Sequence, residues 1–538
     1  MRTTPRRTQL FSLRDFTGGL NLSTDTFRLA ENESPDLQNV DLDRRGGFQV
    51  RRGIAPFSTT PLAAAPDSLW QYDSSGTLYT LAQVGSTVYR GTGTSWTAVG
   101  SSLGSTVQDV CPVTFNNICY WARGNADVVK LNGTTASTLT SAFNNTIVAT
   151  SGNVPRAKHM AVHSGYMWVA GTYESGTHYP NRVRWSWANT FNDSGENWRT
   201  DDYIDIDEGK DSDSITAIIP FGDQLIVFKR DSVYAVYGYS GESFSVVNVS
   251  NSVGAVSHSA AIATSAGLFF FDHAAGLQVY DGKSVRQVFQ QIWPALRDGD
   301  IPRLQVDKID LGWVENRLWV SVPWSDNPIP PRGMTFVFDP YLKQGGSWTK
   351  YTLELGPFSR GHRSDDRLAY VYGTNLVFRL DVAGQYFDDF GPELGVKPID
   401  AWYRTRWVDL GEPAIKKRWR RTEAVMQVDQ GYDLPVVVYA NYDSTVATKN
   451  FLFKAGESSS AGSDGVWDDP ASDWDSAVWA RSGLHGFVDR GANLGVARAV
   501  SLKVGGPVLT TAEVGETQGP VFWGVDALIF KYVPRRVR

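Results

Sequence analysis

The sequence predicts an all-β protein: a β-propeller of about seven blades, preceded by an N-terminal extended arm and followed by a C-terminal antiparallel β-sandwich or barrel-like domain. Between Ser75 and Leu380 one theme recurs seven times, in which a Gly or Asn turn separates two apolar segments. The turn residues are Gly76, Asn117, Gly165, Gly222, Gly267, Asn316 and Gly373. Successive turns are 41 to 57 residues apart. A period of roughly 40 to 50 residues with one hairpin per unit is typical of a propeller and not of a helical solenoid.

The composition supports β structure. The chain has 538 residues, which is enough for two or three domains with a large core. It contains 51 Gly, 19 Trp, 22 Tyr and 26 Phe but only five Met. Turn residues and aromatic residues favour strands and hairpins over helices.

Hydropathy and charge exclude several classes of protein. No apolar run is long enough to cross a bilayer, so we expect no membrane insertion. The opening MRTTPRRTQLFSLRDF lacks an apolar stretch of signal-peptide length, so we expect folding in a cytoplasm. A dedicated binder of duplex DNA is usually basic, whereas the net charge here is −6, so we expect no strong affinity for nucleic acid.

Each repeat extends beyond its first hairpin. A third strand is predicted after the hairpin, and an outer strand such as FSVVNVS (244–250) or SWTKYTL (347–353) would complete a four-stranded blade. The third strands are predicted in 86–91, 128–133, 182–187, 231–238, 276–282 and 334–339. To close the ring, the final unit must pair with a segment from one end of the domain, which removes exposed sheet edges. Seven blades is our count, with six or eight as alternatives.

The pattern divides the chain into three parts. Residues 1–60 are polar and rich in turns, and are predicted to form the extended arm, with short strands at FSLRDF and GGFQVRRG. Residues 61–395 contain the repeats. Residues 396–538 contain longer alternating strands and a Trp-rich insertion, 458–480, predicted to be a surface loop. Helices should be few. The best candidate is QQIWPALRD (290–298), which Pro294 limits.

Two segments carry a family resemblance. The first begins with Phe-x-Gly-Gly-hydrophobic-Asn at 16–21, continues through an Asn-Glu…Leu-x-Asn stretch at 32–39 and ends in Gly…Arg-x-Gly at 46–53. The second, RVRWSWANTFNDSGENW…SVYAVYG (182–238), has a Trp-Ser strand, a loop, an acidic turn and a Leu-Ile-Val-Phe-Lys strand in that order. Both resemble bacteriophage tail proteins of the nozzle, or tail tubular protein B, type and related minor tail proteins. The remainder of the chain resembles them more loosely.

This resemblance implies a structural virion protein of the tail, either a nozzle or hub or a tail-tip ring. It implies a homo-oligomeric ring, most often of six copies, that forms part of the channel for genome ejection. Double-stranded DNA would pass through it transiently, and fibres or tip proteins would attach to its outside. The partners would be other tail proteins, such as an adaptor or tube, and assembly would take place in the host cytoplasm. Whether the tail is short or long stays open.

The densest charge cluster is an acidic run in the middle of the chain. Its members are Asp201, Asp202, Asp205, Asp207, Glu208, Asp211 and Asp213. The segment 205–211 has the alternating carboxylates and the glycine of a calcium loop but lacks the later bidentate Glu. The default interpretation is a solvated loop between strands. A second hypothesis places the run in the lumen, where negative charge would keep DNA from adhering to the wall.

A basic run opens a predicted strand in the C-terminal part. It consists of Lys416, Lys417, Arg418, Trp419, Arg420 and Arg421, and Arg535, Arg536 and Arg538 end the chain. Strict alternation puts Lys417, Trp419 and Arg421 on one face and Lys416, Arg418 and Arg420 on the other. The run is interpreted as a solvated strand edge, a contact with an acidic patch on a neighbouring subunit, or a contact with DNA phosphate. We favour the subunit over DNA, because a grip on phosphate would slow ejection.

Catalytic constellations are missing from the sequence. Asp193, Gly195 and Trp198 resemble the Asp-box turn of sialidase-like propellers, but Phe191 stands where Ser or Thr is expected and the box occurs once. His159 and His163 share a strand face by parity without an evident third ligand. We therefore expect no enzyme activity and no catalytic, cofactor-binding or metal-binding residues.

The two cysteines are predicted to stay apart. If Asn116 and Asn117 form a two-residue hairpin turn, Cys119 lies opposite Thr114 and Cys111 lies opposite Ala122. Residues 111 and 114 then point to opposite faces, so two thiols are expected rather than a disulfide.

Two alternative functions stay open. The first is a carbohydrate-binding adhesin that touches the host surface through the tryptophans of 467–479, among them Trp474. The second is a glycan hydrolase, which would require turnover of a cell-wall or capsule polysaccharide.

Overall fold

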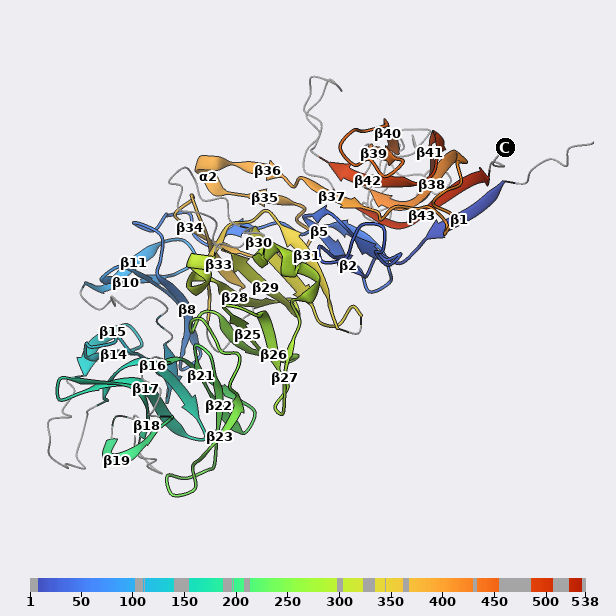
Figure 1. Cartoon of the computed structure of the whole chain (residues 1–538). Coiled ribbons are helices and arrows are strands. Elements are labelled where there is room, and N and C mark those ends of the chain that lie inside the picture. Colours follow the sequence, from blue (N-terminus) through green and yellow to red (C-terminus); the bar gives the residue numbers. More distant parts are fainter. Residues whose placement is uncertain are drawn as a thin grey trace, which may run out of the picture.

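The structure consists of many small sheets, nearly all of them antiparallel, and two larger antiparallel ones (Figure 1). The computed structural model describes residues 8–101, 110, 112–139, 154–186, 196, 198–207, 213–297, 303–322, 334–343, 345–360, 367–428, 433–453, 485–506 and 522–534. In this part of the chain nearly all regular structure is β, which confirms the predicted class.

Seven four-stranded antiparallel sheets form the blades of a propeller, as predicted. The first blade contains β8 (Ser68–Ser74), β9 (Thr77–Val84), β10 (Thr87–Gly91) and β11 (Trp96–Ser101). The second contains β12 (Val113–Phe115), β13 (Ile118–Trp121), β14 (Val128–Asn132) and β15 (Thr135–Leu139). The third contains β16 (Arg156–His163), β17 (Tyr166–Glu174), β18 (Thr177–Ser186) and β19 (Trp198–Asp205). The next two are β20 (Ile215–Phe221), β21 (Gln224–Lys229), β22 (Val233–Tyr237) and β23 (Ser245–Ser250); and β24 (Ala261–Thr264), β25 (Gly267–Asp272), β26 (Gly276–Tyr280) and β27 (Val285–Gln287). The last two are β28 (Asp310–Val314), β29 (Arg317–Val322), β30 (Met334–Asp339) and β31 (Ser347–Tyr351); and β32 (Leu355–Phe358), β33 (Leu368–Val371), β34 (Leu376–Arg379) and β7 (Ala55–Pro56).

The repeated turns are the hairpins of these blades. Six of the seven connect the first and second strands, as in Asn116-Asn117, where both residues have positive φ angles of 48° and 61°. Such mirror-image turns match the twist of the strands, and this explains the recurring Gly and Asn. The seventh turn differs, because Gly373 lies between β33 and β34, the second and third strands of its blade.

The N-terminal strand β7 closes the ring. It pairs antiparallel with β34, with Phe378 opposite Pro56 and Arg379 opposite Ala55, and so supplies the outermost strand of the seventh blade. The first strand of that blade, β32, contacts β8 of the first blade. Closure by a segment from one end of the domain is what the sequence predicted, and the segment comes from the N-terminal side.

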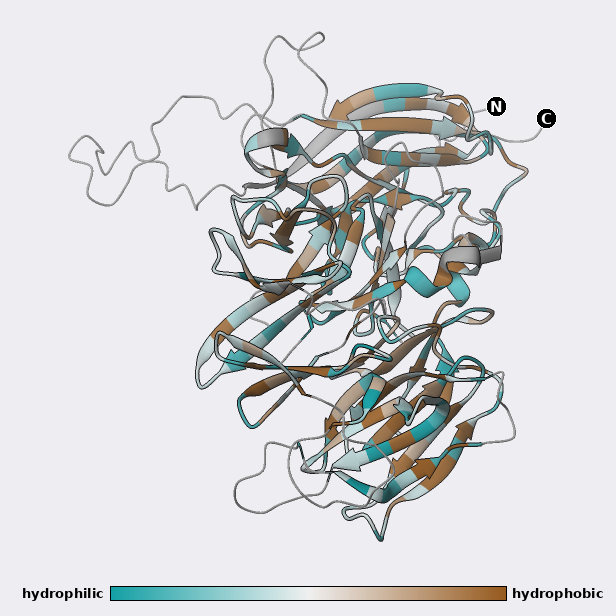
Figure 2. Cartoon of the chain, turned by 90° about the vertical axis from the view of Figure 1, so that its left-hand side faces the viewer, coloured by the Kyte–Doolittle hydropathy of each residue, from teal (hydrophilic) through white to brown (hydrophobic). Residues whose placement is uncertain are grey.

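The C-terminal part is a sandwich of two antiparallel sheets, as expected. One sheet has the order β41 (His485–Ala497), β38 (Lys417–Val428), β43 (Trp523–Pro534), β6 (Phe48–Val50) and β5 (Val40–Leu42), with β1 (Gln9–Leu13) also paired to β43. The other has the order β4 (Leu37–Gln38), β37 (Ala401–Arg404), β42 (Val500–Gly506), β39 (Leu434–Ala440) and β40 (Lys449–Phe453). Apolar and polar residues alternate along these strands (Figure 2), so each sheet has one core-facing side.

The N-terminal residues 8–56 are distributed over both parts of the molecule. The short strands expected near FSLRDF and GGFQVRRG are β1 and β6, and they belong to the first sandwich sheet. β4 belongs to the second sheet and β7 to the propeller, while β2 (Gly19–Leu20) and β3 (Glu33–Ser34) form a small parallel pair beside β31. In place of a free-standing arm, this segment crosses from the sandwich to the propeller.

The helices are short. The 3-10 turn η1 (Gln290–Ile292) and the helix α1 (Trp293–Arg297) occupy the predicted segment, and η2 (Arg303–Lys308) precedes β28. The helix α2 (Gly391–Leu394) joins β35 (Phe387–Asp389) to β36 (Val396–Pro398), between propeller and sandwich. None of the described helices is long and apolar enough to cross a membrane.

One apolar core extends across the boundary between propeller and sandwich. It contains Phe271 and Trp348 from the fifth and sixth blades, Phe16 and Phe48 from the N-terminal segment, and Trp419 from the sandwich, all with 0 or 1% exposure. The N-terminal segment therefore lies within a continuous core.

Candidate functional site: the junction of propeller, N-terminal segment and sandwich

The residues that carry the family resemblance lie at the junction of the two parts. Gly18 and Gly19 allow the N-terminal backbone to lie directly on its neighbours. A Cβ on Gly18 would be 2.5 Å from the carbonyl oxygen of Asn32, and one on Gly19 would be 2.5 Å from that of Trp348. Gly19 also has a φ of 68°, which L side chains rarely adopt. The Gly-Gly pair is thus explained by close approach to β3 and β31.

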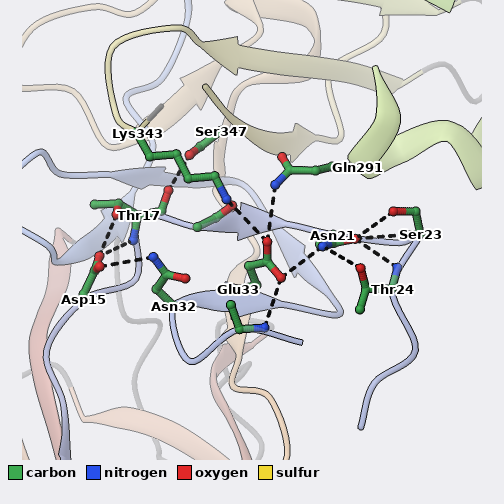
Figure 3. A network of polar contacts seen from close by, with 12 residues as sticks. Asp15, Thr17, Asn21, Ser23, Thr24, Asn32, Glu33, Gln291, Lys343 and Ser347 are labelled. Carbon is green, nitrogen blue, oxygen red and sulfur yellow. Dashed lines mark hydrogen bonds and ion pairs between the residues drawn. The ribbon is translucent and has the colours of Figure 1, made fainter. Parts of the chain in front are cut away.

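Asn21 and Glu33 fix the loop between β2 and β3 (Figure 3). The Asn21 side-chain oxygen accepts hydrogen bonds from the backbone N–H groups of Ser23 and Thr24, each 3.1 Å long. Its amide donates to Glu33 Oε2 over 3.0 Å. Glu33 Oε2 also accepts the Ala30 N–H over 3.1 Å. These bonds hold the two halves of the motif together.

The same carboxylate reaches the propeller. Lys343, between β30 and β31, has its Nζ 3.4 Å from Glu33 Oε1 and 3.2 Å from the carbonyl oxygen of Gly18. The Gln291 side chain of η1 donates to Glu33 Oε1 over 3.4 Å, and Ser347 Oγ donates to the carbonyl of Thr17 (Figure 3). Glu33 therefore joins the N-terminal segment to η1, which follows the fifth blade, and to the sixth blade.

Asp15 stabilises the entry into this loop. Its carboxylate accepts the Thr17 N–H over 2.9 Å, the Thr17 hydroxyl over 2.6 Å and the Asn32 amide over 3.1 Å (Figure 3). Burial alone would raise the pKa of Asp15, but these hydrogen bonds outweigh it and lower the pKa below its ordinary value. The carboxylate is therefore held in its charged form.

Asn39 is the second fixed point. It has a φ of 52°, and its amide donates to Thr352 Oγ1 over 2.8 Å and to the carbonyl of Asp400 over 2.7 Å. Its side-chain oxygen accepts the Thr352 N–H over 2.9 Å and Arg51 Nε over 3.1 Å. One asparagine thus connects the end of the sixth blade with the start of the sandwich.

Arg51 and Gly53 complete the motif. The Arg51 guanidinium makes two hydrogen bonds to the Asp388 carboxylate, 2.9 and 2.6 Å long, and the two side chains are only 2% and 9% exposed. A Cβ on Gly53 would lie 1.6 Å from the carbonyl oxygen of Phe387. The Arg-x-Gly ending therefore provides a buried bidentate ion pair and a backbone contact to β35.

A third group of charged side chains at the junction was not predicted. Arg317 Nη1 lies 2.5 Å from Asp41 Oδ1 and its Nη2 lies 3.3 Å from Asp381 Oδ2, while the Tyr351 hydroxyl donates to Asp41. Burial opposes the charge of Arg317, but the two carboxylates outweigh this and raise its pKa. Burial raises the pKa of Tyr351 and of Asp381. No sequence signal links these residues, because the fold alone brings them together.

The junction is suited to mechanical coupling. Breaking one partner of a buried charge pair is strongly destabilising, so such pairs fix one relative orientation of the elements they join.

The acidic run is divided among several partners. Asp205 forms an ion pair with Arg182 (2.6 Å), Asp207 accepts the Tyr234 hydroxyl (2.9 Å) and Asp213 accepts the Ser232 hydroxyl (2.8 Å). Asp201 is exposed and Asp202 is half-buried on β19, the outermost strand of the third blade. Glu208 and Asp211 lie outside the described residues. Among the residues that the structure does describe, no three His, Cys, Asp or Glu side chains gather as a metal site.

The basic run departs from strict alternation. Lys417 and Trp419 are fully buried, and Lys417 Nζ donates to the carbonyls of Glu412, Ile415 and Arg498 over 2.7 to 3.2 Å. The register of β38 shifts between Trp419 and Glu423, so Arg420 and Arg421 are both exposed. Our placement of Arg421 beside Lys417 was wrong, because this β-bulge turns its side chain outward. Lys416 and Arg418 are exposed, as predicted, whereas 535–538 lie outside the described residues.

The two histidines have different neighbours. His159 stacks on His258, which lies between β23 and β24, with ring centroids 5.7 Å apart, whereas His163 interacts with Asp223. Burial lowers the pKa of His159 to about 4, and Lys158 adds to the shift. Burial also lowers the pKa of His258, with Arg360 beside it.

The remaining candidates are only partly described. Cys119 is buried and lies opposite Thr114, as predicted, while Cys111 lies outside the described residues. The same holds for Asp193, Gly195 and the whole insertion 458–480, whereas Trp198 is buried at the start of β19.

Comparison with known proteins identifies no family. No protein-family model matches the chain, and no curated protein matches it. Similar solved structures include BBS1N in complex with ARL6DN (11% identity, TM-score 0.38, covering 63% of this chain and 98% of that one). They also include the computationally designed Ika8 protein (10% identity, TM-score 0.34, covering 61% of this chain and 99% of that one). A further one is YCF48 bound to D1 peptide (10% identity, TM-score 0.36, covering 60% of this chain and 95% of that one). The propeller assignment rests on the strand pairing of this chain itself.

Proposed function

We propose that this chain is a structural, non-enzymatic protein of a bacteriophage tail, a nozzle or hub or a tail-tip ring. In this role it forms part of the channel for genome ejection and carries fibres or tip proteins. The observation that supports the proposal best is the use of the N-terminal motif. Its glycines, Asn21, Glu33, Asn39 and Arg51 all hold the junction between propeller and sandwich.

A rigid junction suits a protein that must transmit force. A ring wall under ejection must keep its two parts in one orientation, and buried ion pairs together with a continuous core do this. Separate β domains at the ends of a subunit give each copy two surfaces for its neighbours. A heterologous contact repeated around an axis then closes a ring.

The test is the assembly state of the purified full-length chain. Light scattering gives the mass, and negative-stain imaging shows the shape of any assembled species. Closed rings with a channel wide enough for duplex DNA are expected. The protein would instead be an adhesin if it stays a strict monomer, binds a cell-wall or capsule polysaccharide, and loses this binding in Trp474→Ala.

A further inference from the structure

A pocket lies where the blades meet at the axis of the propeller. Their first strands are the innermost ones, since β16 contacts β12 and β20, β24 contacts β20 and β28, and β32 contacts β28 and β8. The N-terminal ends of four of these strands, in the first, fifth, sixth and seventh blades, line a pocket of about 240 Å³, which we call the axial pocket. This is the volume of about eight water molecules, which is enough for one sugar ring.

Beside the axial pocket, side chains close the axis. Arg360, just after β32, donates from Nη1 to the carbonyl of His258 over 2.8 Å, and its Nη2 lies 3.1 Å from Asp310 Oδ1. His258 in turn stacks on His159 of the third blade. Side chains from the third, sixth and seventh blades therefore meet here around His258, and the axial pocket ends against them.

A smaller cavity of about 20 Å³ adjoins the axial pocket, because Asp67, Ser259 and Asp310 line both. It has room for one water molecule. Ser68 also lines it, is only 5% exposed, and its Oγ has no hydrogen-bond partner among the described residues. Burying a hydroxyl without a partner is costly, so its position marks a place suited to a polar group of a ligand or a bridging water.

The axial pocket also carries charged groups that are not used by the fold. Asp67 Oδ2 accepts the Gly85 N–H over 2.8 Å, whereas its Oδ1 accepts no hydrogen bond from the described residues. Asp307 and Lys308 at the end of η2 are exposed, and neither forms an ion pair within the described part of the chain. Two carboxylates and one ammonium group are thus available to a ligand.

The rest of the wall is largely apolar. Pro66, Leu355 and Pro357 line it together with the ring of Tyr372. An apolar wall with a few convergent polar groups is the usual make-up of a small-molecule site, in which the polar groups fix the orientation of the ligand.

The charges favour a neutral ligand that has many hydroxyl groups. An anion is best held by a guanidinium, but Arg360 is already engaged by Asp310 and by backbone carbonyls. A cation would meet the ammonium group of Lys308. A sugar avoids both conflicts, because its hydroxyls donate to carboxylates and accept from an ammonium group. Its C–H faces can pack on proline and tyrosine rings.

We propose that the axial pocket binds a saccharide through one sugar ring. Hydroxyls of the ring donate to Asp67 Oδ1 and to Asp307, Lys308 donates to a sugar oxygen, and Ser68 takes part through the water of the small cavity. The inference goes beyond the proposed function and does not rest on it.

The experiment titrates the full-length chain with glucose, galactose, mannose and N-acetylglucosamine, followed by saturation-transfer NMR and calorimetry. Saturable binding of at least one of them is expected. Asp307→Ala and Lys308→Ala should each weaken it about tenfold, because each removes a charged hydrogen-bonding partner. Ser68→Ala removes a neutral partner and should weaken it about threefold.

Matched controls separate the axial pocket from other surfaces. Glu242 and Lys283 are exposed residues of the fourth and fifth blades that do not line the axial pocket, so Glu242→Ala and Lys283→Ala should bind like the wild type. Trp474→Ala should also keep the binding, which distinguishes the axial pocket from the Trp-rich insertion. Circular dichroism checks that every variant is folded.

Three results would overturn the inference. The first is a wild type that binds none of the four sugars at millimolar concentrations. The second is binding that is unchanged in Asp307→Ala and Lys308→Ala, or that is lost in Trp474→Ala. The third is binding of the diamine putrescine in place of the sugars, weakened by salt, which would assign the carboxylates to a cation. Closed rings together with any of these results would leave the proposed function standing.

Discussion

Glu33 is the residue on which the junction depends most directly. Its carboxylate accepts hydrogen bonds from Asn21, Ala30 and Gln291 and pairs with Lys343, while its side chain is 12% exposed. Removing a buried acceptor leaves several donors without their partner.

We therefore predict that Glu33→Ala lowers the free energy of unfolding by about 2 to 3 kcal/mol. Urea unfolding of the full-length chain measures this. Glu31→Ala is the matched control, because Glu31 is 63% exposed and pairs only at the surface with Arg406, so its loss should cost no more than about 0.5 kcal/mol. Equal effects of the two substitutions would contradict the role given to Glu33.

The stacked histidines make stability depend on pH. Both are neutral in the folded protein because burial lowers their pKa values, that of His159 to about 4. The unfolded chain takes up protons below its ordinary pKa of 6.5, whereas folded His159 does so only near 4. The stability that this group contributes is therefore full above pH 6.5 and is lost as the pH falls toward 4.

We predict that His258→Gln reduces the loss of stability between pH 7 and pH 5, because it removes one neutral histidine and the repulsion that a charged pair would feel. The difference between the denaturant midpoints at pH 7 and pH 5 measures this dependence of stability on pH, which we call the slope. Identical slopes for His258→Gln and the wild type would refute the prediction.

At the scale of the element, the closing strand β7 is the feature that defines the propeller. It has only two residues, Ala55 and Pro56, and pairs with residues more than 300 positions later in the chain. A short strand that closes a long loop is a natural place for a covalent link.

We predict that a disulfide between the cross-strand neighbours, A55C/R379C, stabilises the protein by about 2 to 4 kcal/mol. Thermal melting of the oxidised and reduced forms of one preparation gives the comparison, with mass spectrometry to confirm the new bond. An oxidised form that melts no later than the reduced one would show that the closure is not where unfolding begins.

The repeated hairpins were predictable because each is local. A Gly or Asn turn and its two strands lie within about twenty residues, so the pattern reveals them. The strand order of the seventh blade was predicted only in part, because its outermost strand is β7 and its Gly373 turn joins the second and third strands. Arg421 was misplaced for a similar reason, because a bulge interrupts alternation without a local signature.

The junction was predictable only as a set of motif residues. The sequence singled out 16–21, 32–39 and 46–53, and the structure shows these residues in the junction. Their partners Lys343, Asp388 and Asp400 lie more than 300 residues away, and no local pattern connects residues at that separation. The Arg317 group went unnoticed for the same reason.

At the scale of the whole molecule, the sandwich is not made by the C-terminal sequence alone. Three strands of one sheet, β1, β5 and β6, and one strand of the other, β4, come from the first 50 residues. The core under them contains Phe16, which meets the Tyr403 ring edge-on with ring centroids 5.3 Å apart, and Phe48, which stacks on it at 4.5 Å.

We predict that residues 396–538 expressed alone do not form a cooperative fold, because they leave apolar surface and two sheet edges uncovered. Circular dichroism and thermal melting of the fragment check this, with the full-length chain as the reference. A fragment with a sharp melting transition would show that the sandwich is stable without the N-terminal strands.

The origin of the closing strand also sets an order in time. During synthesis at about 5 to 20 residues per second, roughly 15 to 65 s separate the appearance of Pro56 from that of its partner Phe378. The interval is longer still for β1, because its partner β43 begins at Trp523. The strands that leave the ribosome first are the last to find their hydrogen-bond partners, and through that interval the nascent chain exposes the edges that the finished protein conceals.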